Sequence, residues 1–159
     1  MSHFYNPKDF PDLMALVDHW QEIRAEYDSL KEYAYKWPEE INIDGKWEVI
    51  PLMFFKKKID EKYYAPLTRS LCYNIPNICV IGFSILNPGC HIAPHHGYNK
   101  KTLRAHLGLY TNDQCGLSVL GEIQQWKEGE LIVFDDSVIH EAWNKGTTKR
   151  VNLLLDFYK

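Results

Sequence analysis

The feature that most constrains the fold is a series of short strand-like segments in residues 46–159, separated by turn residues. Frequent turns between many short strands are typical of a sandwich or a barrel. We therefore predict a mainly β fold, a double-stranded β-helix of the jelly-roll type. The predicted strands are residues 46–55, 77–86, 103–110, 117–120, 123–126, 131–134, 138–143 and 150–157, with turns at 44–45 and 88–89 and hairpin turns at 127–130 and 144–147.

A helical segment precedes the predicted strands. Apolar side chains recur at helical spacing in residues 9–35, which predicts one long amphipathic helix or two shorter ones, ended by Trp37-Pro38. The length of 159 residues suits one core. We expect a single domain over residues 1–159, with residues 1–45 as a helical N-terminal cap and residues 46–159 as the jelly-roll core.

Charge and composition exclude several classes of protein. The formal net charge is −3, so the chain has no basic surface that would bind nucleic acid or an anionic membrane. We find no apolar run of about eighteen residues and no signal-peptide pattern. The four cysteines have no Cys-x-x-Cys spacing. We expect a cytoplasmic protein with free thiols and no membrane or nucleic-acid partner.

One predicted strand places two polar side chains among apolar neighbours. Leu103, Ala105, Leu107 and Leu109 alternate with other residues and share one face of the strand. Arg104 and His106 therefore lie together on the opposite face.

The residues with the clearest chemical potential are His95, His140 and Arg150. Two imidazoles can hold a divalent metal, and a guanidinium can hold a carboxylate through two hydrogen bonds. If the strands around the 144–147 turn pair, Arg150 lies beside His140. Together these residues suggest a metal enzyme with an acidic co-substrate, although a single histidine in a β domain is more often structural.

The usual non-haem iron site adds one carboxylate to two histidines, often in the pattern His-x-Asp. Two residues after His95 stands Gly97, which has no ligating side chain. The third ligand is therefore missing, distant or a water molecule. Asp135 and Asp136 are the acids nearest to His140 in the sequence, and one of them could orient a ligand histidine.

Five motifs follow one another along the chain: Phe83-Ser84-Ile85-Leu86-Asn87-Pro88-Gly89, Pro94-His95-His96-Gly97, Leu103-Arg104-Ala105-His106-Leu107-Gly108-Leu109, Trp126-Lys127-Glu128-Gly129-Glu130 and Phe134-Asp135-Asp136-Ser137, with His140-Glu141 following the last. Through these motifs the sequence, from about Trp47 to Tyr158, resembles the aspartyl/asparaginyl β-hydroxylase family of Fe(II)- and 2-oxoglutarate-dependent oxygenases. Members of that family also have glycine where other oxygenases have the acidic ligand.

The resemblance implies a cupin-like jelly roll and a role for each site residue. His95 and His140 would bind Fe(II), and Arg150 would act with them as a catalytic residue. Arg150 and Ser84 would hold the distal carboxylate of 2-oxoglutarate. Arg104 and His106 would contact the C1 end of 2-oxoglutarate, and molecular oxygen would be the oxidant.

The implied function is hydroxylation of an unactivated carbon, the Cβ of an amino acid or of an aspartyl or asparaginyl residue in a peptide. The partner would be a small-molecule or peptide substrate, and the oligomeric state is left open. Two alternatives remain. One is a cupin-like metal dioxygenase or isomerase without 2-oxoglutarate, and the other is a non-catalytic binding domain.

Overall fold

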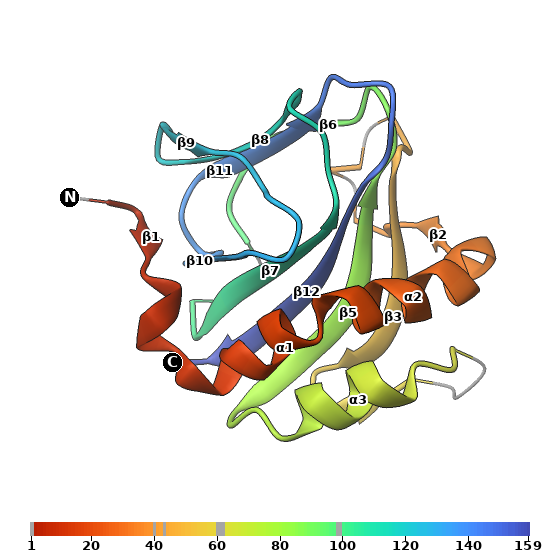
Figure 1. Cartoon of the computed structure of the whole chain (residues 1–159). Coiled ribbons are helices and arrows are strands. Elements are labelled where there is room, and N and C mark those ends of the chain that lie inside the picture. Colours follow the sequence, from red (N-terminus) through yellow and green to blue (C-terminus); the bar gives the residue numbers. More distant parts are fainter. Residues whose placement is uncertain (1, 40, 43, 60–62, 98–99) are drawn as a thin grey trace.

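The chain folds into two antiparallel β-sheets that face each other (Figure 1). A computed structural model describes residues 2–39, 41–42, 44–59, 63–97 and 100–159. The mainly β, jelly-roll prediction is confirmed by this arrangement. The larger sheet has the order β1-β10-β7-β12-β5-β3-β2, with β4 paired to β3, and the smaller sheet has the order β6-β11-β8-β9.

The strands of the larger sheet are β1 (Phe4–Tyr5), β2 (Tyr35–Lys36), β3 (Trp47–Phe54), β4 (Lys57–Lys58), β5 (Ile78–Leu86), β7 (Thr102–Tyr110), β10 (Leu131–Phe134) and β12 (Arg150–Tyr158). Those of the smaller sheet are β6 (His91–His95), β8 (Cys115–Val119), β9 (Glu122–Gln124) and β11 (His140–Asn144). All of the predicted strands are present. The short strands β1, β2 and β4 were not predicted, and neither was β6, which contains His95.

The helices cover the outer face of the larger sheet (Figure 1). They are α1 (Met14–Asp18), α2 (Trp20–Leu30) and α3 (Pro66–Tyr73). Leu103, Ala105, Leu107 and Leu109 of β7 pack in the same apolar cluster as α1 and α2. The alternation predicted for residues 103–109 is therefore confirmed, and it turns Arg104 and His106 toward the smaller sheet.

The N-terminal segment contains two shorter helices rather than one, because the backbone at His19 leaves the helical conformation. The prediction that Trp37-Pro38 ends the helix was wrong. Helix α2 ends at Leu30 and a 3₁₀ turn over Lys31–Tyr33 follows, so β2 separates that turn from Trp37. Helix α3 was also missed. Its marker is Pro66 at the first helical position.

Turns are present at residues 127–130 and 144–147, but the prediction that they form hairpins was wrong. Each turn carries the chain from the smaller sheet to the larger one, because β9 pairs with β8 while β10 pairs with β7 and β1. Likewise, β11 pairs with β6 and β8, whereas β12 pairs with β5 and β7. Turn residues signal a reversal of the chain but do not select the strand that accepts the hydrogen bonds.

None of the helices in the described ranges combines the length and the hydropathy that a transmembrane segment needs.

Candidate functional site

A pocket lies between the two sheets and contains all six predicted site residues. Both sheets contribute to its walls, so the site forms only when they face each other. Its lining residues are Trp47, Ser84, Leu86, Ile92, His95, Arg104, His106, Leu117, Phe134, His140, Ala142, Arg150 and Leu154. The nearby histidines His91 and His96 do not line this pocket. His91 bonds to Glu141, and His96 bonds to the Ser137 carbonyl.

His95 and His140 form a facing pair on neighbouring strands of the smaller sheet. They are direct register partners, and their ring centroids lie 4.3 Å apart. The Nδ1 atoms bond to the carbonyl oxygens of Ala93 at 2.8 Å and Val138 at 2.7 Å. A carbonyl only accepts, so each Nδ1 carries a hydrogen, and the Nε2 of each ring is the nitrogen that can bind a metal. Burial lowers the pKa of His95, which favours this neutral form.

Asp136 places a carboxylate beside this pair. Its Oδ1 lies 3.2 Å from His140 Nε2. Two acceptors at this distance repel each other, so either a proton on His140 Nε2 or a bound cation lies between them. Burial by itself raises the pKa of Asp136, but the Arg104 guanidinium and a hydrogen bond from His140 outweigh it and lower that pKa to about 2.

Gly97 is required where it stands because Asp136 fills the space next to it. A Cβ at position 97 would overlap the Asp136 carboxylate, and the Gly97 N–H donates to the Asp136 carbonyl at 2.7 Å. The carboxylate near the histidine pair therefore comes from the segment before β11 and not from position 97. Among the described residues, no group of three His, Cys, Asp or Glu side chains is placed to hold a metal ion.

Arg150 is a buried cation on the larger sheet. Its Nη2 donates to Ser84 Oγ at 2.9 Å and to the Ser84 carbonyl at 3.1 Å, and its guanidinium lies 4.4 Å from the Trp126 ring centroid. Trp47 Nε1 also donates to Ser84 Oγ, at 2.9 Å, so the serine hydroxyl hydrogen is left for another acceptor.

No carboxylate of the described residues forms an ion pair with Arg150. Burial lowers the pKa of Arg150 to about 10, and the group therefore stays charged at neutral pH. A buried charge without a counter-ion is costly, so this position suits an anionic ligand. The pocket brings Arg150 and His140 together across the two sheets, not through the strand pairing that the sequence suggested.

Arg104 is also buried, but the protein supplies its counter-ions. Its Nε and Nη2 donate to the two carboxylate oxygens of Asp156 at 2.7 and 2.9 Å, and its Nη1 lies 2.9 Å from Asp136 Oδ1. Sequence reasoning missed Asp156. The available signal was an acid within the apolar β12, on the same side of the sheet as its register partner Arg104.

His106 presents a hydrogen-bond donor to the pocket. Its Nδ1 accepts from Trp126 Nε1 at 3.1 Å. Burial, with Arg150 and Arg104 nearby, lowers the pKa of His106 well below 6.5, so the ring is neutral and its hydrogen is on Nε2. That buried Nε2 has no hydrogen-bond partner in the described part of the chain. An oxygen of a bound ligand would satisfy it.

A family model described as aspartyl/asparaginyl β-hydroxylase matches residues 17–159 of this chain. The chain is 32% identical over 168 residues to ornithine lipid ester-linked acyl 2-hydroxylase of Rhizobium tropici, covering 98% of this chain and 60% of that protein. It is 28% identical over 169 residues to human aspartyl/asparaginyl beta-hydroxylase, covering 98% of this chain and 22% of that protein. The chain thus spans only part of the length of these relatives.

Solved structures are similar at the level of the fold. An oxidoreductase of the 2OG-Fe(II) oxygenase family from Burkholderia pseudomallei superposes with a TM-score of 0.65 and 13% identity, covering 85% of this chain and 77% of that one. A cupin domain of an XRE family transcriptional regulator from Enterobacter cloacae gives a TM-score of 0.51 and 14% identity, covering 72% of this chain and 98% of that one. Identity this low supports the cupin-like jelly roll and no particular chemistry.

Proposed function

The chain belongs to the aspartyl/asparaginyl β-hydroxylase family, and from that premise we propose that it is an Fe(II)- and 2-oxoglutarate-dependent hydroxylase. The observation that carries this proposal is the buried, uncompensated Arg150 beside Ser84, in the same pocket as the histidine pair. A site with two imidazoles and a separate buried cation suits a metal together with a dicarboxylate.

In this proposal His95 and His140 hold the iron through their Nε2 atoms. Both rings are fixed by Nδ1 hydrogen bonds to backbone carbonyls, which sets the ligating tautomer before metal arrives. Bound iron, 2-oxoglutarate and molecular oxygen together supply the oxidation that converts C–H to C–OH. Asp136, held by Arg104, keeps a negative charge beside His140.

Arg150 and Ser84 would hold the distal carboxylate of 2-oxoglutarate. The guanidinium is already aimed by Ser84, and the buried charge gains the counter-ion that the protein does not provide. Arg104 and His106 would contact the C1 end, where the His106 Nε2–H has a hydrogen bond to donate. These residues orient the co-substrate and exclude water, because all four side chains are buried.

The proposed reaction adds a hydroxyl group to an unactivated carbon, the Cβ of an amino acid or of an aspartyl or asparaginyl residue in a peptide. One relative is named as a hydroxylase of a lipid acyl chain, and another as a hydroxylase of aspartyl or asparaginyl groups. Membership of the family therefore supports hydroxylation as the reaction but does not select one substrate. We take the chain as one catalytic domain, and its buried free thiols fit a reducing cytoplasm.

Two other functions remain to be separated from this one. A cupin-like metal dioxygenase or isomerase would use the histidine pair without 2-oxoglutarate, and it normally has three or four protein ligands. A binding domain would keep the pocket without turnover. The first alternative does not account for a buried Arg150 that lacks a counter-ion, and the second differs from the proposal only in the absence of turnover.

The deciding experiment is an anaerobic titration of the Fe(II)-loaded protein with 2-oxoglutarate, followed by the visible charge-transfer band of the chelate. We expect a saturable band that Arg150→Ala removes while iron stays bound. Lys149→Ala changes the exposed neighbouring cation and should leave the band unchanged. Bound iron without a band in the parent protein would contradict the proposal and favour the two alternatives.

A further inference from the structure

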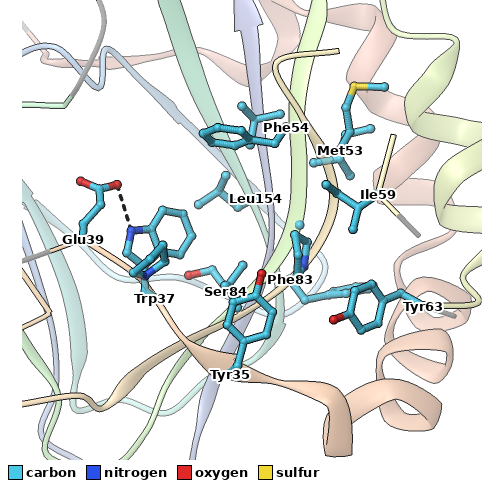
Figure 2. Close-up of a pocket in the computed structure, with 16 residues that line it drawn as sticks. Tyr35, Trp37, Glu39, Met53, Phe54, Ile59, Tyr63, Phe83, Ser84 and Leu154 are labelled. Atoms are coloured by element: carbon cyan, nitrogen blue, oxygen red, sulfur yellow. Dashed lines mark hydrogen bonds between the residues drawn. The ribbon is translucent and has the colours of Figure 1, made fainter. Parts of the chain in front are cut away.

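Two stacked tryptophan rings connect the candidate site to the outer part of the molecule. Trp47 lines the pocket that contains the histidine pair, whereas Trp37 lines a separate cavity of about 420 Å³ (Figure 2). The two indole rings are stacked, with their centroids 4.1 Å apart and their planes 4° from parallel. The contact between the pocket and the outer cavity is therefore made by aromatic rings, which can carry an electron without an open channel.

Hydrogen bonds hold this stack in place. The Trp37 N–H donates to the Trp47 carbonyl at 2.8 Å. The Asn42 amide donates to the carbonyls of both tryptophans, at 3.0 and 2.9 Å, and accepts from the Trp47 N–H at 3.1 Å. Trp47 is buried, and its Nε1 donates to Ser84 Oγ. The parallel arrangement is therefore fixed by the surrounding strands and not by the contact between the rings alone.

The charges near the stacked pair differ from those near the other three tryptophans. An arginine or lysine lies 4.4 to 5.7 Å from the ring centroid of each of the others, which are Trp20, Trp126 and Trp143. Over the described ranges no such cation lies above Trp37 or Trp47, and Trp37 Nε1 donates to a Glu39 carboxylate oxygen at 2.9 Å (Figure 2). An indole that loses an electron becomes positive, which a nearby cation opposes and a nearby carboxylate favours. The stacked pair is therefore easier to oxidise than the other three rings.

Glu39 can also accept the proton that this oxidation releases. An indole that has lost an electron is a much stronger acid than a neutral one, and the Trp37 N–H already lies within hydrogen-bond reach of the carboxylate. Trp47 donates instead to the Ser84 hydroxyl, which is a poor base. The electron vacancy therefore comes to rest on Trp37, the outer ring, as a neutral indolyl radical.

We propose that the stacked pair is a one-electron relay, which reduces the metal site when that site has reacted with oxygen and no substrate is bound. This inference rests on the proposed hydroxylase function. Trp47 gives an electron to the site, Trp37 gives an electron to Trp47, and the Trp37 Nε1 proton moves to Glu39. A small soluble thiol then reduces the radical on the half-buried Trp37, and Glu39 returns the proton.

Two passes along the relay balance the reaction. Oxidative decarboxylation of 2-oxoglutarate leaves one atom of the oxygen molecule to be reduced, and a substrate C–H bond would normally supply the two electrons. Without substrate, two electrons from the relay and two protons from solvent convert that atom to water. Two thiols supply the electrons, release two protons and form one disulfide. The tryptophans and Glu39 end unchanged, and the histidine pair is spared the oxidation.

The first test uses metal-free protein and so does not depend on the hydroxylase proposal. A soluble ruthenium photo-oxidant with an electron-accepting quencher removes one electron from the protein after a laser flash, and transient absorption follows the indolyl radical. Trp37→Phe keeps an aromatic ring and should lower the radical yield several-fold. Trp143→Phe, at another half-buried tryptophan, should leave the yield unchanged.

Glu39→Gln separates the proton step from the electron step. The amide oxygen still accepts the indole hydrogen bond, but it is not a base. Because Glu39 is exposed, this substitution does not threaten the core. The radical should still form, and its conversion from the cationic to the neutral form should be several-fold slower than in the parent protein.

The second test asks whether the metal site supplies the oxidation. Protein loaded with Fe(II) and 2-oxoglutarate is mixed with oxygen in the absence of substrate, freeze-quenched and examined by electron paramagnetic resonance. Peptide mass spectrometry then locates the oxidised residues. We expect a tryptophan radical and oxidation products at Trp37. Trp37→Phe should lose both, and glutathione should remove both from the parent protein.

Three results would overturn the relay. One is an equal radical yield in Trp37→Phe and the parent protein, and another is an equally fast neutral radical in Glu39→Gln. The third is oxidation at Trp126 instead of Trp37, or no tryptophan radical at all, in protein that shows the charge-transfer band with 2-oxoglutarate. Because the band is measured first, failure of the relay is distinguished from failure of the hydroxylase proposal.

Discussion

The two buried arginines of the pocket have opposite electrostatic environments. Asp156 and Asp136 neutralise Arg104, whereas Arg150 has a serine, a tryptophan ring and no carboxylate in the described ranges. A fold that compensates one buried cation and not the other leaves the second for a ligand. Both residues are arginines, so residue type does not distinguish their roles. The presence or absence of a carboxylate partner does, and it assigns Arg104 to the structure and Arg150 to ligand binding.

The Arg104–Asp156 pair is expected to contribute strongly to stability. Asp156→Ala should lower the free energy of unfolding by about 3 kcal/mol, because it leaves a buried guanidinium with only Asp136 as a partner. Urea denaturation of the metal-free protein measures the change. Asp113→Ala, at an exposed loop carboxylate, should change it by less than about 0.5 kcal/mol. Equal effects of the two substitutions would show that the pair is not a stabilising one.

The neutral state of His106 predicts how stability depends on pH. Its pKa in the folded protein is well below 6.5, whereas in the unfolded chain it is about 6.5. Below about pH 6.5 the unfolded chain therefore binds a proton that the folded protein does not, and stability falls as pH falls. His95 acts in the same direction.

Each such proton contributes a slope of at most about 1.4 kcal/mol per pH unit. The free energy of unfolding is measured by urea denaturation between about pH 7 and pH 5.5 in the presence of a chelator. His106→Gln should make its dependence on pH less steep by the contribution of one proton. His19→Gln, at an exposed histidine, provides the matched control. An unchanged slope in His106→Gln would mean that His106 titrates in the folded state as it does in the unfolded chain.

At the scale of elements, helix α3 depends on a side chain from α2. Glu26 accepts hydrogen bonds from the backbone N–H groups of Leu67 and Thr68 at 2.9 and 2.7 Å and from the Thr68 hydroxyl at 2.6 Å. The residue before α3, Ala65, has no side chain that could cap it. The carboxylate therefore supplies both the missing acceptors and a negative charge at the helix N-terminus.

Glu26→Ala should consequently lower the free energy of unfolding by about 1–2 kcal/mol, since it leaves the first turn of α3 without acceptors. The measurement is again urea denaturation. Glu22→Ala removes an exposed glutamate on the same helix, which pairs with His19, and it should cost at most about 0.5 kcal/mol. A Glu26→Ala protein as stable as Glu22→Ala would show that the cap is replaced by water.

For the molecule as a whole, the site joins the two sheets. The histidine pair is on the smaller sheet, and Ser84 and Arg150 are on the larger one. A metal bound by the pair contacts one sheet, whereas 2-oxoglutarate bound to that metal and to Arg150 would connect both. Ligand binding should therefore stabilise the fold in two separate steps.

Thermal unfolding can resolve these steps with Mn(II) in place of Fe(II). Adding 2-oxoglutarate at about 100 times its Kd to the metal-loaded protein should raise the Tm by about 5–10 °C, from about 2.7 kcal/mol of binding energy. Arg150→Ala should keep the metal shift and lose the 2-oxoglutarate shift, and His140→Ala should lose both. If the 2-oxoglutarate shift survives in Arg150→Ala, the co-substrate does not use this guanidinium.

By itself the sequence determined the main strands and the composition of the site. Alternation in residues 103–109, the strand segments, the non-ligating Gly97 and the six pocket residues were all predicted, because they follow from local periodicity, residue type and family motifs. Only the tertiary structure decided which strands pair across residues 127–130 and 144–147, and hence that Arg150 faces His140 across two sheets.

The tertiary structure also decided the contacts that complete the site. Asp136 occupies the space beside Gly97, Asp156 neutralises Arg104, and Trp37 stacks on Trp47, which lines the pocket. Each of these contacts joins residues that are separated in the sequence. It forms only when the strands and sheets have packed together. A local pattern specifies which face a side chain takes, but the partner on the opposite face depends on how the whole molecule closes.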